Sequence, residues 1–140
     1  MAGIRSEPSW EAIVQVNRLV QVAQHADDLD RAAAFYSSLL GVAPAARYDP
    51  PGLLFFTVGG VRLLLEQGAS SALLYLGVDS VRDTVERLRA AGVTIEAEPH
   101  VIFHHDDDAL GPAGTAEWMA FLRDSEGNMV GLVSHEPPEG

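Results

Sequence analysis

The stretch DLDRAAAFYSSLLG, residues 28–41, contains the start, the apolar face and the end of one helix. Asp28 is placed to cap the first turn, and Asp30 adds negative charge near the positive end of the helix dipole. Gly41 can adopt the left-handed conformation that ends many helices. Apolar side chains recur at helical spacing on one face; they are Ala32, Phe35, Tyr36, Leu39 and Leu40. The stretch therefore predicts an amphipathic helix that packs on a partner element.

Strands are expected on both sides of this helix, and the same order of elements occurs twice. Alternation and turn residues predict one strand before the helix and three after it. The expected strands of the first half are 19–25, 45–48, 53–58 and 61–66. In the second half we expect a strand at 73–78, a helix from Ser80 to Gly92, and strands at 93–98, 116–123 and 129–134. Two tandem βαβββ units, about 17–68 and 70–135, within a single domain 1–140 are the simplest interpretation.

Composition limits the partners of the chain. Twenty acidic and nine basic residues give a net charge of -11, which disfavours binding to nucleic acid or to an anionic membrane surface. The chain has no cysteine, so disulfides, thiolate metal sites and cysteine nucleophiles are excluded. Residues 1–10 lack the apolar segment of a secretory signal, and no apolar run has membrane-spanning length. We expect a cytoplasmic protein with frayed ends.

The helix at 28–41, taken with FLRDSEGNMVGL at 121–132, resembles the vicinal oxygen chelate superfamily, also called the glyoxalase/bleomycin-resistance/dioxygenase fold. The resemblance covers residues 19–134. It implies an α+β fold in which two βαβββ units form a cup-shaped, half-barrel mixed sheet with the helices outside, and it implies a homodimer. The superfamily includes isomerases, epimerases, lyases, dioxygenases and metal-free drug-binding resistance proteins, so the cavity residues must decide the function.

The resemblance also implies four ion-binding positions that face the cavity, in the first, fourth, fifth and last strands. Here they fall on Gln21, Glu66, Leu73 and Gly131. Strand alternation independently predicts that these positions face inward. Leu73 and Gly131 offer no donor, and a neutral amide with one carboxylate leaves a divalent ion short of charge and ligands. A degenerate metal site, with no metal bound, is therefore predicted.

Two residues are candidates for catalysis. Glu66 on a cavity-facing strand among apolar side chains is a potential general base; the alternative is a strand-end glutamate that reaches water. His100 follows Pro99 at a strand end near the cavity mouth, or it has only a structural hydrogen bond. The candidate ligand-binding residues are Gln21, Arg62, Leu73, Tyr75, Trp118 and Met129.

These ligand-binding candidates have structural alternatives. Gln21 either binds a ligand or satisfies Glu66, while Tyr75 and Trp118 either contact a ligand or only pack in the core. Arg62 and Glu66 are predicted on one face about 13 Å apart, so only a ligand could bridge them.

The segment HVIFHHDDD, residues 100–108, consists mainly of potential metal ligands. Its position after the strand at 93–98 and before a loop rich in glycine and charge favours a different interpretation. We expect His104, His105 and the three aspartates to lie on a solvated surface at the start of a mobile loop, 106–114.

Two functions of different classes follow. The first is binding of a small organic molecule in the sheet cavity without a cofactor, by sequestration or by acid/base chemistry through Glu66 and His100. The alternative is a lyase or isomerase of glyoxalase type, with a divalent metal such as Zn, Ni, Mn or Fe held by Gln21, Glu66 and His100. A cavity filled by the protein's own side chains is a third possibility. Whether the protein is an enzyme stays open at this point.

Overall fold

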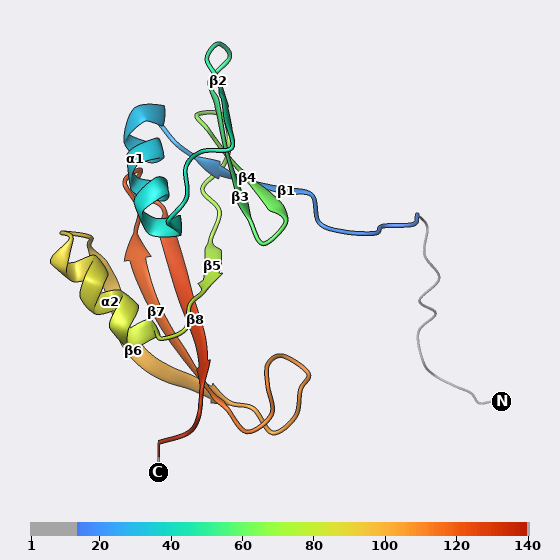
Figure 1. Ribbon diagram of the computed structural model, residues 1–140, viewed down its shortest axis with the longest axis vertical. Helices are drawn as coiled ribbons and strands as arrows, with labels where there is room; N and C mark the ends of the chain where they lie inside the picture. The colour runs from blue at the N-terminus through green and yellow to red at the C-terminus, as the bar shows by residue number, and fades with distance from the viewer. Residues whose placement is uncertain (1–13, 140) are drawn as a thin grey trace.

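The computed structural model describes residues 14–139, and it contains the predicted order of elements twice (Figure 1). The first unit consists of β1 (Gln21–His25), α1 (Leu29–Leu40), β2 (Ala46–Tyr48), β3 (Leu53–Val58) and β4 (Val61–Glu66). The second consists of β5 (Leu74–Gly77), α2 (Val81–Ala90), β6 (Ile95–His104), β7 (Ala116–Arg123) and β8 (Met129–Glu136). The predicted α+β fold is confirmed. The expectations for residues 1–10 lie outside the described residues.

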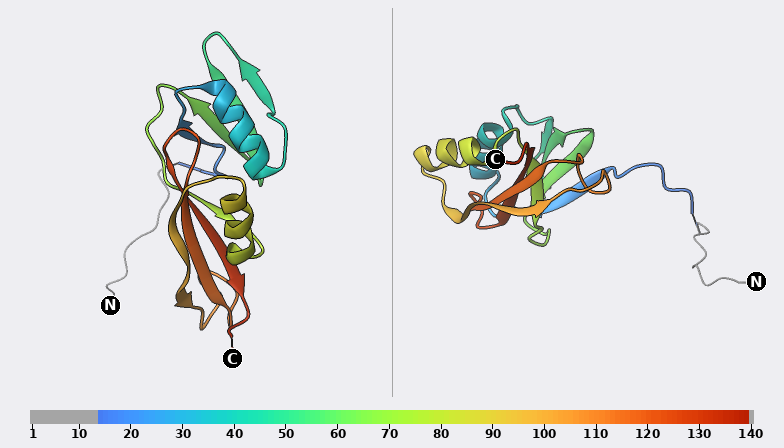
Figure 2. Two further views of the ribbon diagram at one scale, coloured as in Figure 1. Left: turned by 90° about the vertical axis from the view of Figure 1, so that its left-hand side faces the viewer. Right: turned by 90° about the horizontal axis from the view of Figure 1, so that it is seen from below.

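The strands form two four-stranded mixed sheets with the same topology. The strand order is β1-β4-β3-β2 in the first sheet and β5-β8-β7-β6 in the second. In each sheet the first strand of the unit pairs in parallel with the last, and the other pairs are antiparallel. The two units follow one another along the long axis, and both helices cover the same side of the molecule (Figures 1 and 2). None of the helices within residues 14–139 is long and apolar enough to cross a membrane.

The helix ends follow the predicted capping. The Asp28 side chain accepts a hydrogen bond from the Arg31 backbone N–H at 3.0 Å, and Gly41 is left-handed with φ 70°. Ser80 caps α2 in the same way through the Asp83 backbone N–H. Each cap stabilises its helix by about 1 kcal/mol, so local sequence fixes where both helices begin.

Alternating strand residues divide between a helix-covered face and an open face. Leu63 and Leu65 of β4 pack with α1, whereas Val130 and Leu132 of β8 pack with α2. Phe35 of α1 contacts both cores and so joins the two units. The intervening residues therefore lie on the open face, as strand alternation predicts.

A buried polar network connects the two motifs that carry the resemblance. The Tyr36 hydroxyl donates to Asp124 Oδ2 at 2.6 Å, and Asn128 Nδ2 donates to the same oxygen at 2.8 Å. Asn128 Nδ2 also donates to the His25 carbonyl at 2.8 Å. Burial, reinforced by the Asp124 carboxylate, raises the pKa of Tyr36 far above its ordinary value. The network thus ties α1 and β1 of the first unit to the β7–β8 turn of the second.

Strand β6 is longer than predicted. It continues through Pro99 as far as His104, which pairs with Ala116 of β7. Shifts in register along this pairing absorb the irregularity, and β6 is the edge strand, where a proline costs no ladder hydrogen bond. The prediction that the strand ends at residue 98 is therefore wrong.

Candidate functional site

The register of β1 and β4 separates the two first-sheet residues that were expected to share an ion. Gln21 lies opposite Arg62, and Arg62 Nε donates to Gln21 Oε1 at 3.0 Å. Glu66 lies opposite His25. Four residues of strand, about 13 Å, separate the Glu66 position from that of Gln21, too far for one ion. The alternatives in which Gln21 shares a metal with Glu66, or satisfies its carboxylate, are therefore wrong.

The last-strand position is filled by aromatic rings. Gly131 of β8 lies between Tyr75 of β5 and Phe121 of β7 in the sheet register. A Cβ atom on Gly131 would lie 2.7 Å from Tyr75 Cδ1 and 3.1 Å from Phe121 Cε1. The two rings meet edge to face with their centroids 5.9 Å apart. A guanidinium beside Gln21 and rings over Gly131 do not fit the divalent ion that the resemblance implies at these positions.

Glu66 has a different environment from the one predicted. It lines an open pocket of about 670 Å³ beside the start of α1, together with Asp27, Asp28, Asp30 and Asp49. This lining is strongly acidic. The prediction of an apolar surrounding for Glu66 is wrong, and the alternative of a strand-end glutamate that reaches water agrees with the structure.

Three other predicted residues, His100, Met129 and Trp118, lie in the second sheet. His100 lies exposed on edge strand β6, where its Nδ1 is 2.8 Å from the Glu98 carbonyl oxygen. Met129 is partly buried at the start of β8. Trp118 lies on the helix-covered face, where it packs with the second core and the Arg82 guanidinium stacks on its ring at 4.0 Å. The structure therefore does not bring Trp118 and His100 together with Gln21 and Glu66.

A small apolar groove does join residues of the two sheets. It has a volume of about 190 Å³ and is lined by Val22, Val58, Val61, Arg62, Leu63, Leu74, Tyr75 and Leu76. Arg62 and Tyr75 are thereby brought to one groove, and Tyr75 is 53% exposed. Neighbouring Leu73 is 49% exposed. The Arg62 guanidinium also lies 5.7 Å from the centroid of the Phe55 ring.

Arg62 differs from most of the other arginines in its partners. Arg31, Arg47, Arg82, Arg89 and Arg123 each form an ion pair with a carboxylate. Within residues 14–139, the side-chain partner of Arg62 is the neutral Gln21 amide, and no carboxylate lies at ion-pairing distance. Its positive charge is therefore available to an anion.

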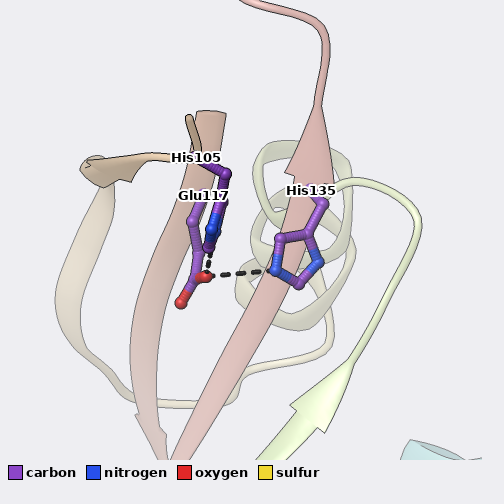
Figure 3. Close-up of side chains that lie close together, drawn as sticks. All are labelled: His105, Glu117 and His135. Atoms are coloured by element: carbon purple, nitrogen blue, oxygen red, sulfur yellow. Dashed lines mark hydrogen bonds and ion pairs between the residues drawn. The ribbon is translucent and has the colours of Figure 1, made fainter. Parts of the chain in front are cut away.

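A cluster that the sequence reasoning missed lies on the open face of the second sheet (Figure 3). His105 Nε2 lies 2.8 Å and His135 Nε2 3.0 Å from Glu117 Oε1. His105 is 4% exposed, so its predicted place on a solvated surface is wrong, whereas His104 and residues 106–108 are exposed as expected.

The path of the chain after β6 explains the burial of His105. Its backbone N–H donates to the Thr115 carbonyl and its own carbonyl accepts from Gly114. Within the loop, Asp107 accepts a hydrogen bond from the backbone N–H of Ala109, and Asp108 accepts one from that of Ala113. The segment 106–114 lies against the sheet, where Gly111 closely approaches His135; its mobility stays a prediction.

Comparison with known proteins agrees with the fold. The model of the Glyoxalase/Bleomycin resistance protein/Dioxygenase superfamily matches residues 18–132. The cadmium-induced proteins CadI of Mycobacterium bovis and Mycobacterium tuberculosis are 38% identical over 88 residues, which is 56% of this chain and 57% of each relative. The chain thus spans about half the length of these curated relatives.

Two solved structures show the same architecture. Lactoylglutathione lyase from Agrobacterium tumefaciens matches with a TM-score of 0.61 and 24% identity, over 86% of this chain and 95% of that one. A glyoxalase-related enzyme from Fulvimarina pelagi matches with a TM-score of 0.64 and 20% identity, over 85% and 88%. At this identity the likeness concerns the fold. Because the family model covers most of the chain, the protein belongs to the Glyoxalase/Bleomycin resistance protein/Dioxygenase superfamily.

Proposed function

We propose that the protein binds a small organic acid at the groove between its two sheets, without a metal at the ion positions of the superfamily. The observation that carries this proposal is the Arg62 guanidinium, which is exposed, oriented by Gln21 and free of a carboxylate partner within residues 14–139. A guanidinium repels a divalent cation but binds a carboxylate through two parallel hydrogen bonds. The same residue therefore opposes the metalloenzyme alternative and favours an anionic ligand.

The surroundings of Arg62 suit the remainder of such a ligand. The groove wall is mainly valine and leucine, and the exposed Tyr75 ring adds an apolar surface with a hydroxyl group. A site of this kind combines an apolar lining with few polar groups, which fix the orientation of the ligand. We propose an acid with a small aromatic or aliphatic body, bound by sequestration; an acid/base step through Glu66 or His100 gains no support from their positions.

A homodimer is part of the proposal. The groove, about 190 Å³, is smaller than typical ligand pockets of about 300–1,000 Å³, so a ligand would extend onto the open face. Leu73 and Tyr75 expose apolar surface beside it. A second copy packed there would cover both the ligand and these side chains. Light scattering is expected to give the mass of a dimer, and Leu73→Lys to shift it toward the monomer; a monomeric wild type would contradict this part.

The experiment compares charged and neutral probes in a chelating buffer. Benzoate and phenylacetate, with their amides as uncharged counterparts, are titrated into the full chain by calorimetry. We expect a carboxylate to bind about tenfold more tightly than its amide, and Arg62→Gln to remove this preference. Arg47→Gln is the matched control, because Arg47 lies in the same sheet but is paired with Asp30. Failure of all carboxylates to bind, or equal binding by the Arg62 variant, would contradict the proposal.

A further inference from the structure

We propose that His105, Glu117 and His135 form a binding site for a divalent cation of the zinc type, on the open face of the second sheet and apart from the superfamily's ion positions. His135 lies four residues beyond Gly131 on β8, about 13 Å along the strand. The site is independent of the proposed organic-acid groove, which involves Arg62 and Tyr75. One protein would then have an anion-binding site between its two sheets and a cation-binding site at the far end of the second sheet.

The donor set matches the chemistry of zinc. Two imidazole nitrogens and one carboxylate oxygen are borderline donors that zinc and related ions prefer, and three protein ligands with one open position are typical of accessible zinc sites. The candidate ligand atoms all lie within 4.8 Å of one another. Figure 3 shows a dashed line from one nitrogen of each imidazole to the same oxygen of the Glu117 carboxylate.

The contacts of the two histidines with Glu117 require only a small adjustment to admit an ion. Around a tetrahedral zinc with bonds of 2.0–2.1 Å, ligand atoms lie about 3.4 Å apart. The two histidine Nε2 atoms now lie 2.8 and 3.0 Å from Glu117 Oε1. Outward shifts of about half an ångström in these contacts would open the space, and side-chain rotations supply such shifts without moving the strands.

The backbone holds the three residues in place before any ion arrives. Glu117 and His135 are direct cross-strand partners in the antiparallel β7–β8 pair, so their side chains point to the same face. His105 is fixed by two backbone hydrogen bonds at the base of the loop, with its side chain 2% exposed. The Glu117 and His135 side chains are 16% and 30% exposed. The site is therefore buried at His105 and open to solvent at His135.

The loop that follows His105 is shaped to the cluster. A Cβ atom on Gly111 would lie 2.7 Å from His135 Nε2 and Cδ2, and 3.0 Å from His105 Cε1. Only glycine allows the loop to approach both imidazoles this closely. The aspartates at 106–108 on the same loop add a negative potential that attracts cations.

The competing explanation is that His105, Glu117 and His135 form hydrogen bonds that only stabilise the fold, and it makes a different prediction. Substitution of these residues would then lower the stability of the protein, but zinc would not bind at this place. Glu117→Gln separates the two explanations, because the amide keeps the shape and an acceptor oxygen while it loses the charge and most of the affinity for a metal.

The experiment is a calorimetric zinc titration of the full chain after removal of metals with EDTA. We expect one zinc per chain, with affinity lowered about 100-fold or more in Glu117→Gln and in His135→Ala. The matched control His104→Ala removes an exposed histidine of the same segment and should bind zinc as the wild type does. Circular dichroism spectra and thermal unfolding establish that each variant is folded. Cobalt(II) added to the metal-free chain should give the visible absorption of a four-coordinate site.

Two outcomes would overturn the proposal. The first is a wild type that binds no zinc, and the second is a folded Glu117→Gln variant that binds it equally well, because the ion would then rest on the acidic surface. The test also stands apart from that of the proposed function. Arg62→Gln should leave zinc binding unchanged, and Glu117→Gln should leave the affinity for carboxylates unchanged, so either proposal can fail alone.

Discussion

The open faces of the two sheets carry opposite chemistry. In the first sheet Gln21 is paired with the Arg62 guanidinium, which excludes cations and can bind an anion. At the far end of the second sheet, Glu117 and its cross-strand partner His135 point to the same face, and the Nε2 atoms of His105 and His135 both lie within 3.0 Å of Glu117 Oε1. In both sheets, these strand residues belong to the alternating set that points to the open face. The difference shows that the residues directly opposite one another, rather than the fold, decide which ion a face of this sheet accepts.

The largest loss of stability is expected from a substitution in the buried network of Tyr36, Asp124 and Asn128, which connects the two units. Asp124→Ala removes the acceptor of Tyr36, of the Asn128 side chain and of two backbone N–H groups. Leaving these donors unpaired in the interior should lower the free energy of unfolding by about 3 kcal/mol. Urea unfolding followed by fluorescence measures it, with Asp106→Ala as an exposed control. A loss no larger than that of the control would show that the two units are positioned by apolar packing alone.

Gly131 tests whether rings have replaced the superfamily's last-strand ligand. Gly131→Ala should cost about 1–3 kcal/mol, because the new Cβ would overlap the Tyr75 ring. Gly77→Ala is the matched control, since a Cβ there meets nothing within 4 Å. In a Tyr75→Ala background the cost of Gly131→Ala should largely disappear. Thermal unfolding of the wild type, the two single variants and the double variant measures this coupling between the two positions. Equal costs at both glycines would mean that the space over Gly131 is still open to a ligand.

The attachment of α1 to the second unit should depend on pH. Glu126 accepts from the backbone N–H groups of Asp27 and Asp28 and pairs with Arg31. The hydrogen bonds from Arg31 lower the pKa of Glu126 from 4.5 to about 2, against a smaller opposing effect of burial. Because the pKa of Glu126 is lower in the folded chain than in the unfolded chain, the ionised carboxylate stabilises the fold. This contribution is complete at pH values above 4.5 and is lost as the pH falls toward 2.

We expect this contribution to be about 1 kcal/mol, because Arg31 is half exposed. Unfolding free energies measured between pH 5 and about pH 2 should fall less steeply in Glu126→Gln than in the wild type. Parallel curves for the two chains would show that the Arg31 pair does not hold the units together.

Much of the fold could be predicted from local signals. The capping residue Asp28, the apolar stripe of α1 and Gly41 fix one helix, and alternation assigns the strand faces correctly. The length of β6 could not be predicted, because Pro99 normally ends a strand and its tolerance depends on β6 lying at the sheet edge.

The sites were less predictable, because they depend on register. Alternation places Gln21, Arg62 and Glu66 on one face, but only the pairing of β1 with β4 shows which of them is the neighbour of Gln21. In the same way, nothing local distinguishes His105 from the exposed His104. The burial of His105 follows from the β6–β7 pairing and from the return of the loop, both of which join residues distant in sequence.

The central claim is that the groove beside Arg62 binds an organic acid without a metal. The most direct test measures the affinity of the Glu117→Gln chain for phenylacetate, first in EDTA and then with zinc or nickel in excess, so that the histidine cluster plays no part. The account predicts the same affinity in both conditions and its loss in the additional Arg62→Gln variant. Binding that disappears in EDTA and returns with the metal would contradict the account and restore the metalloenzyme alternative.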